Sequence, residues 1–294
     1  MTSVFVLGLA TADFMFSVAT MPTRPEKYRA DGCTIVGGGC AANAAVTIAR
    51  LGGAPRLAAR IGDDVTGDII AGELQGEGVD LTHLHRDPGG RSSCSSVLVD
   101  AQGERQIVNF RGAGLVEGTG WLTDVPRARA VLTDSRWREG ALFALKLARE
   151  WGVPGILDAE PPTDPDLARA ASHVAFSRGG LDRFAGTDDI ADGLHRARQL
   201  TGAFLAVTNG ADGCYWLDGD RVGHLPAPTV DPVDTLGAGD AWHGALALQL
   251  ARGMGEVPAM AFANAVGALA TTGFGGRAGS PTQARLDTFL KEAR

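Results

Sequence analysis

The sequence lacks the features that mark secreted, membrane-spanning and disulfide-stabilised proteins. Its four cysteines, Cys33, Cys40, Cys94 and Cys214, lie far apart with no paired spacing, which argues against a disulfide framework or a zinc site and favours a reducing cytoplasm. No apolar run reaches the roughly 18 residues that a membrane span needs. The N-terminus has no basic region and reaches Asp13 early, so it predicts a first strand rather than a signal peptide.

Positive charge is also scarce. The 27 lysines and arginines are outnumbered by 34 acidic residues, which gives a net charge of −7, and the arginines are scattered. Nucleic-acid binders usually carry a basic surplus or a basic stripe, so no nucleic-acid partner is expected. Apolar residues make up 45% and charged residues 21%, which is typical of a folded globular protein.

Glycine, by contrast, is abundant. The chain has 41 glycines, and they gather in short clusters at the ends of apolar runs. Such positions are where a backbone turns tightly or approaches a ligand closely. The glycine clusters therefore indicate where binding sites are to be sought.

Short apolar segments alternate with helical ones along most of the chain. Strands are expected at 4–9, 57–61, 131–133, 155–158, 173–176 and 203–208, and this alternation predicts a doubly wound α/β domain with a mostly parallel sheet. Two β-rich excursions, about 13–36 and 92–112, do not follow that rhythm. They are expected to meet as a small β-sheet lid over the carboxyl ends of the parallel strands. We expect one domain over 1–294.

The most informative motif is Asp234-Thr-Leu-Gly-Ala-Gly-Asp240, which runs directly into an apolar helix. Small residues at a helix N-terminus leave backbone N–H groups bare, and the helix dipole adds partial positive charge. Gly237, Ala238 and Gly239 therefore suit an anion hole for a phosphoryl group, and Asp240 suits a base that accepts a proton from a hydroxyl. The alternative is that Asp234 and Asp240 only cap the helix.

This motif resembles the C-terminal signature of the PfkB, or ribokinase-like, sugar kinases. Two upstream stretches, Gly37-Gly-Gly-Cys-Ala-Ala-Asn43 and Ile61-Gly-Asp-Asp64, resemble the N-terminal part of the family pattern. The similarity extends from about Val4 to Phe289. It implies a ribokinase-like α/β fold with a β-sheet lid, and an ATP-dependent kinase that phosphorylates a sugar hydroxyl.

The resemblance also implies roles for individual residues. On the sugar side it assigns the catalytic base to Asp240, the anion hole to Gly237, Ala238 and Gly239, and the sugar contacts and lid hinge to Asp13, Gly38 and Asn43. On the nucleotide side it assigns the phosphate and ribose loop to Thr208, Gly210 and Gly213, and the adenine wall to Asn264 and Gly275. Either asparagine could instead be a locally satisfied amide.

Metal binding is only partly implied. ATP arrives with Mg²⁺, and Asp234 matches a residue near a monovalent-cation site in relatives, so K⁺ is an open candidate. The family often carries Asn-x-x-Glu after residue 174, whereas this chain reads Phe176-Ser-Arg-Gly-Gly-Leu181. No protein ligand for Mg²⁺ is therefore assigned.

Several strings resemble the sulfofructose kinases, which phosphorylate the C1 hydroxyl of 6-deoxy-6-sulfofructose. They include Glu26-Lys-Tyr28, Asp134-Ser-Arg-Trp137 and Gly275-Gly-Arg-Ala-Gly-Ser-Pro281. A sulfonate is a permanent anion that should meet cations and amide donors. Lys27, Asn109 and Arg136 are the residues expected to converge on it.

Other interpretations stay open at this point. Fructokinase, ketohexokinase and ribokinase share the same catalytic residue and differ in the sugar pocket. Gly37-x-Gly-x-x-Ala42 partly fits a dinucleotide fingerprint and would suggest an NAD-dependent oxidoreductase, but it lacks the third glycine. A non-catalytic sugar-sensing module is a further alternative. Exposed lid strands commonly pair between subunits, so a homodimer formed through the lid is expected.

Overall fold

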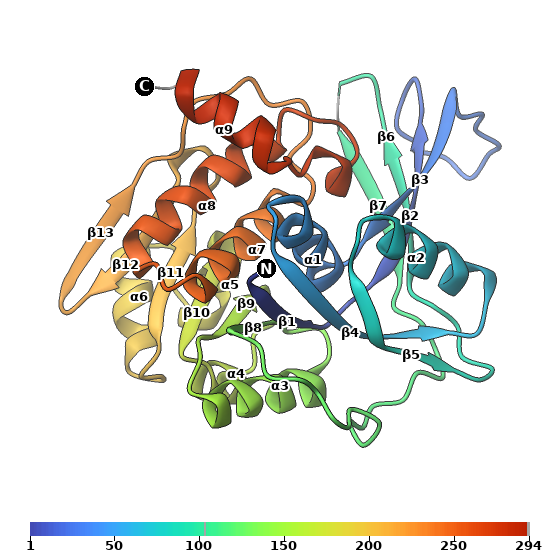
Figure 1. Cartoon of the computed structure of the whole chain (residues 1–294). Helices are drawn as coiled ribbons and strands as arrows, with labels where there is room; N and C mark the ends of the chain where they lie inside the picture. The colour runs from blue at the N-terminus through green and yellow to red at the C-terminus, as the bar shows by residue number, and fades with distance from the viewer. Residues whose placement is uncertain (103, 293–294) are drawn as a thin grey trace.

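A nine-stranded sheet forms the centre of this computed structural model, which describes residues 1–102 and 104–292 (Figure 1). Its strand order is β13-β12-β11-β10-β9-β8-β1-β4-β5. The strands from β5 to β11 pair in parallel, and β12 and β13 add antiparallel edges. Their bounds are β1 (Ser3–Leu7), β4 (Ala54–Gly62), β5 (Asp80–Asp87), β8 (Ala130–Asp134), β9 (Gly155–Ala159), β10 (His173–Ser177), β11 (Phe204–Thr208), β12 (Cys214–Asp218) and β13 (Arg221–Leu225). The predicted doubly wound, mostly parallel sheet is confirmed.

Helices cover both faces of this sheet. On β1, Val4 and Val6 belong to one buried cluster, while Phe5 and Leu7 belong to another on the opposite face, as the twofold repeat of a strand requires. The first layer contains α1 (Cys40–Arg50), α2 (Val65–Gly76), α7 (Ala238–Ala251), α8 (Glu256–Ala270) and α9 (Gln283–Glu292). The second contains α3 (Arg138–Trp151), α4 (Pro165–Ala170), α5 (Arg178–Ala185) and α6 (Ile190–Arg198). No described helix is both long and apolar enough to cross a membrane.

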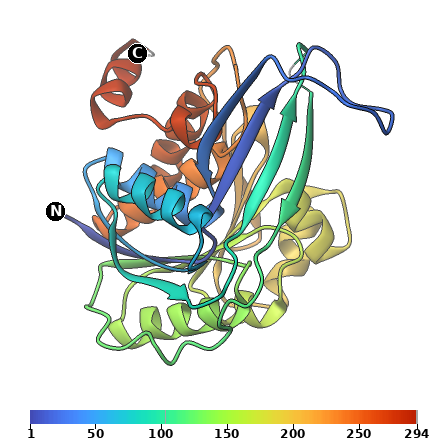
Figure 2. The same ribbon diagram turned by 90° about the vertical axis from the view of Figure 1, so that its right-hand side faces the viewer.

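A second, four-stranded sheet projects from one side of the large sheet, as Figures 1 and 2 show. Its order is β3-β2-β6-β7, with bounds β2 (Thr11–Ser17), β3 (Gly32–Gly38), β6 (Cys94–Val99) and β7 (Arg105–Phe110). The two predicted excursions meet where β2 and β6 pair in parallel. The expected lid sheet is thus present, although Gly103 of the predicted 101–104 turn lies outside the described residues.

One buried carboxylate fixes the edge where the lid meets the large sheet. Asp134, at the end of β8, accepts backbone hydrogen bonds from Leu9 at 2.8 Å, from Ala41 at 3.2 Å and from Arg136 at 2.8 Å. A Cβ at Gly8 would overlap with this carboxylate, so the absence of a side chain there lets β1 approach β8. Asp134 thereby holds the β1 exit against the N-terminus of α1, beside the first turn of α7.

Candidate active site

Asp240 lies in the first turn of α7, at the carboxyl edge of the large sheet. The helix is preceded by Gly237, whose φ of 73° is a left-handed conformation that glycine adopts without strain. The amides of Ala238 and Gly239 follow in the first turn, and the Ala238 amide donates a long hydrogen bond to the Thr235 carbonyl at 3.4 Å. Gly237, Ala238 and Gly239 therefore lie next to the Asp240 carboxylate at the start of α7.

Asn43 on α1 reaches this carboxylate directly. Its Nδ2 atom donates to Oδ2 of Asp240 at 2.6 Å, while its Oδ1 atom accepts from Nε of Arg277 at 2.9 Å. An arginine can only donate, so Arg277 determines which end of the amide faces Asp240. The guanidinium also donates to the Gly38 carbonyl at 2.9 Å, and a Cβ at Gly37 would overlap with it. Arg277 is 2% exposed, and burial lowers its pKa.

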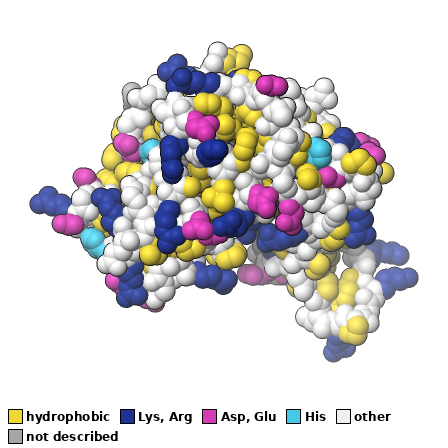
Figure 3. All heavy atoms as spheres, turned by 90° about the horizontal axis from the view of Figure 1, so that it is seen from below, with side chains coloured by type: hydrophobic (Ala, Val, Ile, Leu, Met, Phe, Trp, Pro, Cys, Tyr) yellow, Lys and Arg dark blue, Asp and Glu magenta, His cyan; other side chains and the backbone are white. Residues whose placement is uncertain are grey.

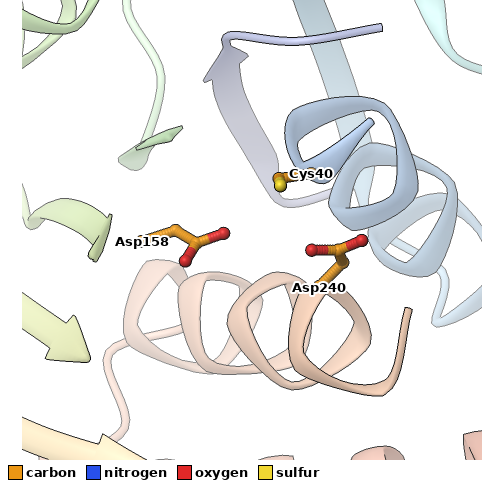
Figure 4. A group of neighbouring side chains, drawn as sticks. All are labelled: Cys40, Asp158 and Asp240. Carbon is orange, nitrogen blue, oxygen red and sulfur yellow. The ribbon is translucent and has the colours of Figure 1, made fainter. Parts of the chain in front are cut away.

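Three side chains converge at this point, as Figure 4 shows. The Cys40 sulfur, an Asp158 oxygen and an Asp240 oxygen all lie within 4.8 Å of one another. Burial raises the pKa of Asp240, although the Asn43 hydrogen bond lowers it. Burial, together with the charges of Asp240 and Glu160, raises the pKa of Asp158 well above its usual value. One Asp158 oxygen is buried without a hydrogen-bond partner among the described residues, so this carboxylate could serve as a ligand for a cation.

The Cys40 thiol completes this corner without chemical activation. Burial raises its pKa well above the ordinary value, and the carboxylates of Asp240 and Asp158 raise it further. A thiol with a raised pKa is a poor nucleophile at neutral pH. We therefore interpret Cys40 as a packing group between the two carboxylates and Arg136.

His243 lies in the same helix as Asp240 and is buried, with 2% of its surface exposed. Its Nδ1 atom is 2.7 Å from the Gly239 carbonyl, and its Nε2 atom is 3.6 Å from a carboxylate oxygen of Asp158. Burial lowers its pKa, although the Asp240 charge raises it, and the Nε2 atom also lies 3.2 Å from the Ala175 carbonyl. The contact between His243 and the Gly239 carbonyl stabilises the first turn of α7.

The lid supplies a polar row that faces the same space. Asp13 on β2 pairs with Ser95 on β6, which in turn pairs with Asn109 on β7, and Asn109 donates to the Ser95 hydroxyl at 3.0 Å. Burial raises the pKa of Asp13, and its Oδ1 atom has no described partner. A Cβ at Gly38 would overlap with the Asp13 carboxylate. Asp13 and Gly38, two of the predicted sugar contacts, thus lie side by side, and Asn109 lies two strands away in the same row of the lid sheet.

Lys27 does not join them. It is exposed in the segment between β2 and β3, beyond the Ser17–Gly32 pair that ends the lid sheet. Asp13 lies four residues before Ser17, which corresponds to roughly 13 Å along a strand. The predicted convergence of Lys27 with Asn109 and Arg136 is therefore absent within this chain. The reason is that the lid loop extends away from the sheet edge, which sequence adjacency could not reveal.

Arg136 lies deeper than expected, at the exit of β8. Its side chain donates to the Pro161 carbonyl at 3.1 Å. Burial alone would lower its pKa, but the neighbouring Cys40 and Asp134 raise it. Arg136 therefore borders the corner formed by Cys40, Asp158 and Asp240 rather than the outer lid.

A separate cleft of about 420 Å³ opens on the other side of Asp240, between the end of β11, the first turn of α7 and α8. Four of the five residues predicted to bind nucleotide line it, together with Ala238 and Gly239, which are predicted to belong to the anion hole. These four are Thr208, Gly210, Gly213 and Asn264. The cleft is mostly apolar with a few polar groups, as is usual for a site that takes a flat heterocycle.

Two of the predicted nucleotide residues are engaged within the protein. Asn264 accepts from Trp242 Nε1 at 2.8 Å and donates to the Leu225 carbonyl at 3.0 Å, so its amide is satisfied and forms part of the cleft wall. Gly275 is not a lining residue; its N–H donates to Asp234 at 2.9 Å. Gly275 therefore shapes the turn rather than the cleft surface.

Asp234 is also engaged by the lid. Its carboxylate is fully buried, accepts from the Leu236 amide at 2.8 Å and forms an ion pair with Arg105 at the start of β7. A guanidinium thus pairs with the carboxylate that the family resemblance associates with a monovalent cation. This ion pair also connects the lid sheet to the segment that precedes α7.

Sequence reasoning missed Arg277 and Asp158. Asp158 ends a buried strand, and the rule that ligands bind at the carboxyl edge of a parallel sheet could have found it. Arg277 lies in a glycine-rich turn with no local signal. It becomes significant only because the fold brings that turn against Asn43.

Comparison with known proteins agrees with this geometry. The profile of the pfkB family carbohydrate kinases matches residues 1–283. The aminoimidazole riboside kinase of Salmonella typhimurium is 31% identical over 99% of this chain and 95% of its own length. Fructokinase-1 of Zea mays is 29% identical over 87% of this chain and 88% of its own.

Solved structures show the same architecture. A crystal structure from Agrobacterium tumefaciens has a TM-score of 0.93 at 36% identity, covering 99% of this chain and 98% of that one. The aminoimidazole riboside kinase of Salmonella enterica, complexed with aminoimidazole riboside and an ATP analogue, has a TM-score of 0.80 at 26% identity, covering 98% of this chain and 100% of that one. The fold is ribokinase-like, and the chain belongs to the pfkB family of ATP-dependent carbohydrate kinases.

Proposed function

We propose that the protein transfers the γ-phosphoryl group of ATP to a primary hydroxyl of a ketose, with Asp240 as the general base. The observation that carries this proposal is the position of Asp240, between the nucleotide cleft and the polar row of the lid. In the reaction Asp240 accepts the hydroxyl proton, the freed oxygen attacks the γ-phosphorus, and the bond to ADP breaks. The amides of Gly237, Ala238 and Gly239 receive the charge of the transferring group.

Our preferred substrate is 6-deoxy-6-sulfofructose, phosphorylated at C1. The sequence strings quoted above support this choice, as does the presence of Asn109 beside Asp13. Asp13 would accept two neighbouring sugar hydroxyls, because its free oxygen has no described protein donor. Fructose and ribose are the competing substrates, and the names of the fructokinase and ribokinase relatives favour them.

We propose that Asp158 holds the Mg²⁺ that accompanies ATP, in place of the missing Asn-x-x-Glu glutamate. Mg²⁺ in kinase sites takes one or two carboxylates, substrate phosphates and waters, and the unpartnered oxygen of Asp158 fits that set. The Cys40 thiol does not, because soft sulfur is a poor ligand for a hard cation. When bound, the ion neutralises charge on the phosphates. Asp158 provides the anchoring carboxylate and Asp240 stays available for the proton.

For Asp234 we propose that Arg105 supplies the positive charge that K⁺ would otherwise provide. The guanidinium already pairs with the buried carboxylate, and two backbone amides, of Leu236 and Gly275, satisfy the remaining lone pairs. Activity is then independent of K⁺ in the unmodified protein.

We propose a homodimer formed through the outer face of the lid. Strand register places Ile35 and Val108 in one row on this face, and they are 46% and 69% exposed, while Phe14 in the same row packs against the main core. Light scattering after gel filtration should give twice the chain mass for the wild type. Ile35→Lys with Val108→Lys should give the monomer mass; a wild-type monomer would refute the dimer.

We propose that its partners are small molecules in the reducing cytoplasm, not nucleic acids. All four cysteines are free in the structure. On the face seen in Figure 3, basic and acidic side chains are interspersed, and no broad basic field covers it. A phosphate backbone would find no continuous track of cations there.

The deciding experiment is a coupled ADP-release assay with 6-deoxy-6-sulfofructose, fructose, fructose 6-phosphate, ribose and nucleosides. Release with a ketose supports the proposal, and the largest kcat/KM identifies the substrate. Asp240→Asn should lower kcat by about 10²- to 10⁴-fold while ATP still binds. Near-normal turnover by that variant would refute the assignment of the base.

A further inference from the structure

Three arginines from separate parts of the chain line one small hollow beneath the lid. Arg60 comes from β4, Arg111 follows the last lid strand, and Arg136 follows β8. The other lining residues are Gly8, Leu9, Ser93, Leu115 and Trp137. No carboxylate lines the hollow, and within residues 1–102 and 104–292 none of these arginines forms a salt bridge.

Two of these guanidinium groups are held in place by the protein. Arg60 lies 4.3 Å from the centre of the Trp137 ring and donates to the Val116 carbonyl at 2.6 Å. Arg136 donates to the Pro161 carbonyl. Groups that are already ordered lose little entropy when they bind a ligand. Burial lowers the pKa of Arg60, yet an arginine stays charged in proteins.

The third arginine belongs to the lid. Arg111 is exposed and directly follows β7. It comes one residue after Phe110 and two residues after Asn109 in the chain. A ligand that reaches Arg111, Arg60 and Arg136 together would therefore connect the lid to the large sheet. Such a ligand would favour the closed lid by its own charge.

The hollow is close to the catalytic corner and distinct from the nucleotide cleft. Arg136 neighbours Cys40, whose sulfur lies within 4.8 Å of an Asp240 oxygen. None of its lining residues is shared with the nucleotide cleft. If one end of a sugar places its hydroxyl at Asp240, the opposite end of the sugar can reach this hollow. The hollow, about 40 Å³ in volume, has room for one small group and not for a sugar ring.

We propose that this hollow binds the anionic group of the sugar substrate, at the end opposite the phosphorylated hydroxyl. The inference rests on the proposed sugar-kinase function and names its substrate class. Planar guanidinium groups suit the several oxygens of a sulfonate, a phosphate or a carboxylate. Arg60, Arg111 and Arg136 then provide the charge that Lys27, outside the site in this chain, does not.

The test compares Arg111→Gln with the matched control Arg221→Gln, an exposed arginine on the distant edge strand β13. Arg111 is exposed and makes no described hydrogen bond with its side chain, so its loss should not affect folding, which Tm verifies. We expect kcat/KM for an anionic sugar to fall about 10- to 100-fold in Arg111→Gln, and for fructose to change little. Arg221→Gln should match the wild type. An equal loss for fructose and for the anionic sugar would overturn the inference.

The substrates distinguish the possible anions. 6-Deoxy-6-sulfofructose, fructose 6-phosphate and a keto sugar acid carry a sulfonate, a phosphate and a carboxylate respectively, and a preference for any of them over fructose supports the hollow. If the wild type prefers fructose, the inference fails while the kinase function stands. If no sugar supports ADP release, the proposed function itself fails.

Inorganic sulfate gives a readout that does not depend on turnover of an anionic sugar. It should inhibit phosphorylation of fructose in the wild type and in Arg221→Gln, with at least a several-fold weaker effect in Arg111→Gln. Sodium chloride at equal ionic strength corrects for screening. Equal inhibition of all three proteins by sulfate would count against an anion site at Arg111.

Discussion

The Nδ2 atom of Asn43 donates a hydrogen bond to Oδ2 of Asp240 at 2.6 Å. The bond stabilises the carboxylate form of a group whose pKa burial otherwise raises. Arg277 keeps the amide in this orientation, because it occupies the other end of Asn43. Arg277, in a turn near the C-terminus, thus orients the amide that lowers the pKa of Asp240 on α7.

The first prediction concerns Asn43→Leu. Loss of the amide removes a donor that lowers the pKa of Asp240, so that pKa rises. Because the base acts when deprotonated, the acidic limb of the kcat/KM profile should move to higher pH, with the smallest effect at alkaline pH. Asp240→Asn should abolish the limb altogether. An unchanged limb in Asn43→Leu would show that the hydrogen bond does not tune the base.

The same substitution should reduce stability. Arg277 would lose an acceptor inside the protein, which costs about 1–3 kcal/mol of the free energy of unfolding. Asn43→Asp keeps an acceptor for Arg277 but places a second carboxyl group against Asp240, which raises the pKa of the pair. Its acidic limb should therefore also move to higher pH, and urea denaturation beside the pH profile would compare the two variants.

Asp158→Asn tests the proposed metal anchor. We expect the Mg²⁺ concentration needed for half-maximal activity to rise at least tenfold, because a neutral amide replaces the unpartnered carboxylate. The control Asp220→Asn, in the turn between β12 and β13, removes a charge far from the site. A wild-type Mg²⁺ dependence in Asp158→Asn would exclude this role.

Arg105→Gln tests the charge beside Asp234. The wild type should have equal rates in potassium and sodium chloride, because the guanidinium already neutralises the carboxylate. The variant leaves a buried acid without a cation and should lose about 1–3 kcal/mol of stability, partly recovered by K⁺. Potassium activation of the wild type would contradict the proposed replacement.

Gly267→Leu tests the nucleotide cleft. Gly267 lies on α8 and lines the cleft, where a Cβ would meet the Ala238 carbonyl and Trp242 at ordinary contact distance. A leucine should fill the cleft and raise KM for ATP at least tenfold while KM for the sugar changes little. Gly72→Leu, on α2 with open space around it, is the matched control. Unchanged ATP affinity would place the nucleotide elsewhere.

The sequence predicts the strands that are buried on both faces, because such strands appear as continuous apolar runs. It does not predict β5, whose sequence Asp-Leu-Thr-His-Leu-His-Arg-Asp is polar and lies at the sheet edge. Nor does it predict α5, where Gly179 and Gly180 disfavour a helix that the Ser177 cap and packing nevertheless stabilise.

The residues of the candidate site also fall into those that the sequence predicts and those that it does not. Asp240 and its amides can be predicted, because they follow one another along the chain and their chemistry is local. Arg277 and Arg60 cannot, because their partners lie far away in sequence and only the folded topology brings them together. Lys27 shows the converse error, since a residue inside a predicted lid segment need not face the site.

The glycine at position 37 has a consequence for protein engineering. Any side chain there would displace the Arg277 guanidinium, and with it the orientation of Asn43. A mutant library that varies position 37 without also varying position 277 would therefore disturb the contact between Asn43 and Asp240. Redesign of the end of β3 has to treat positions 37 and 277 together.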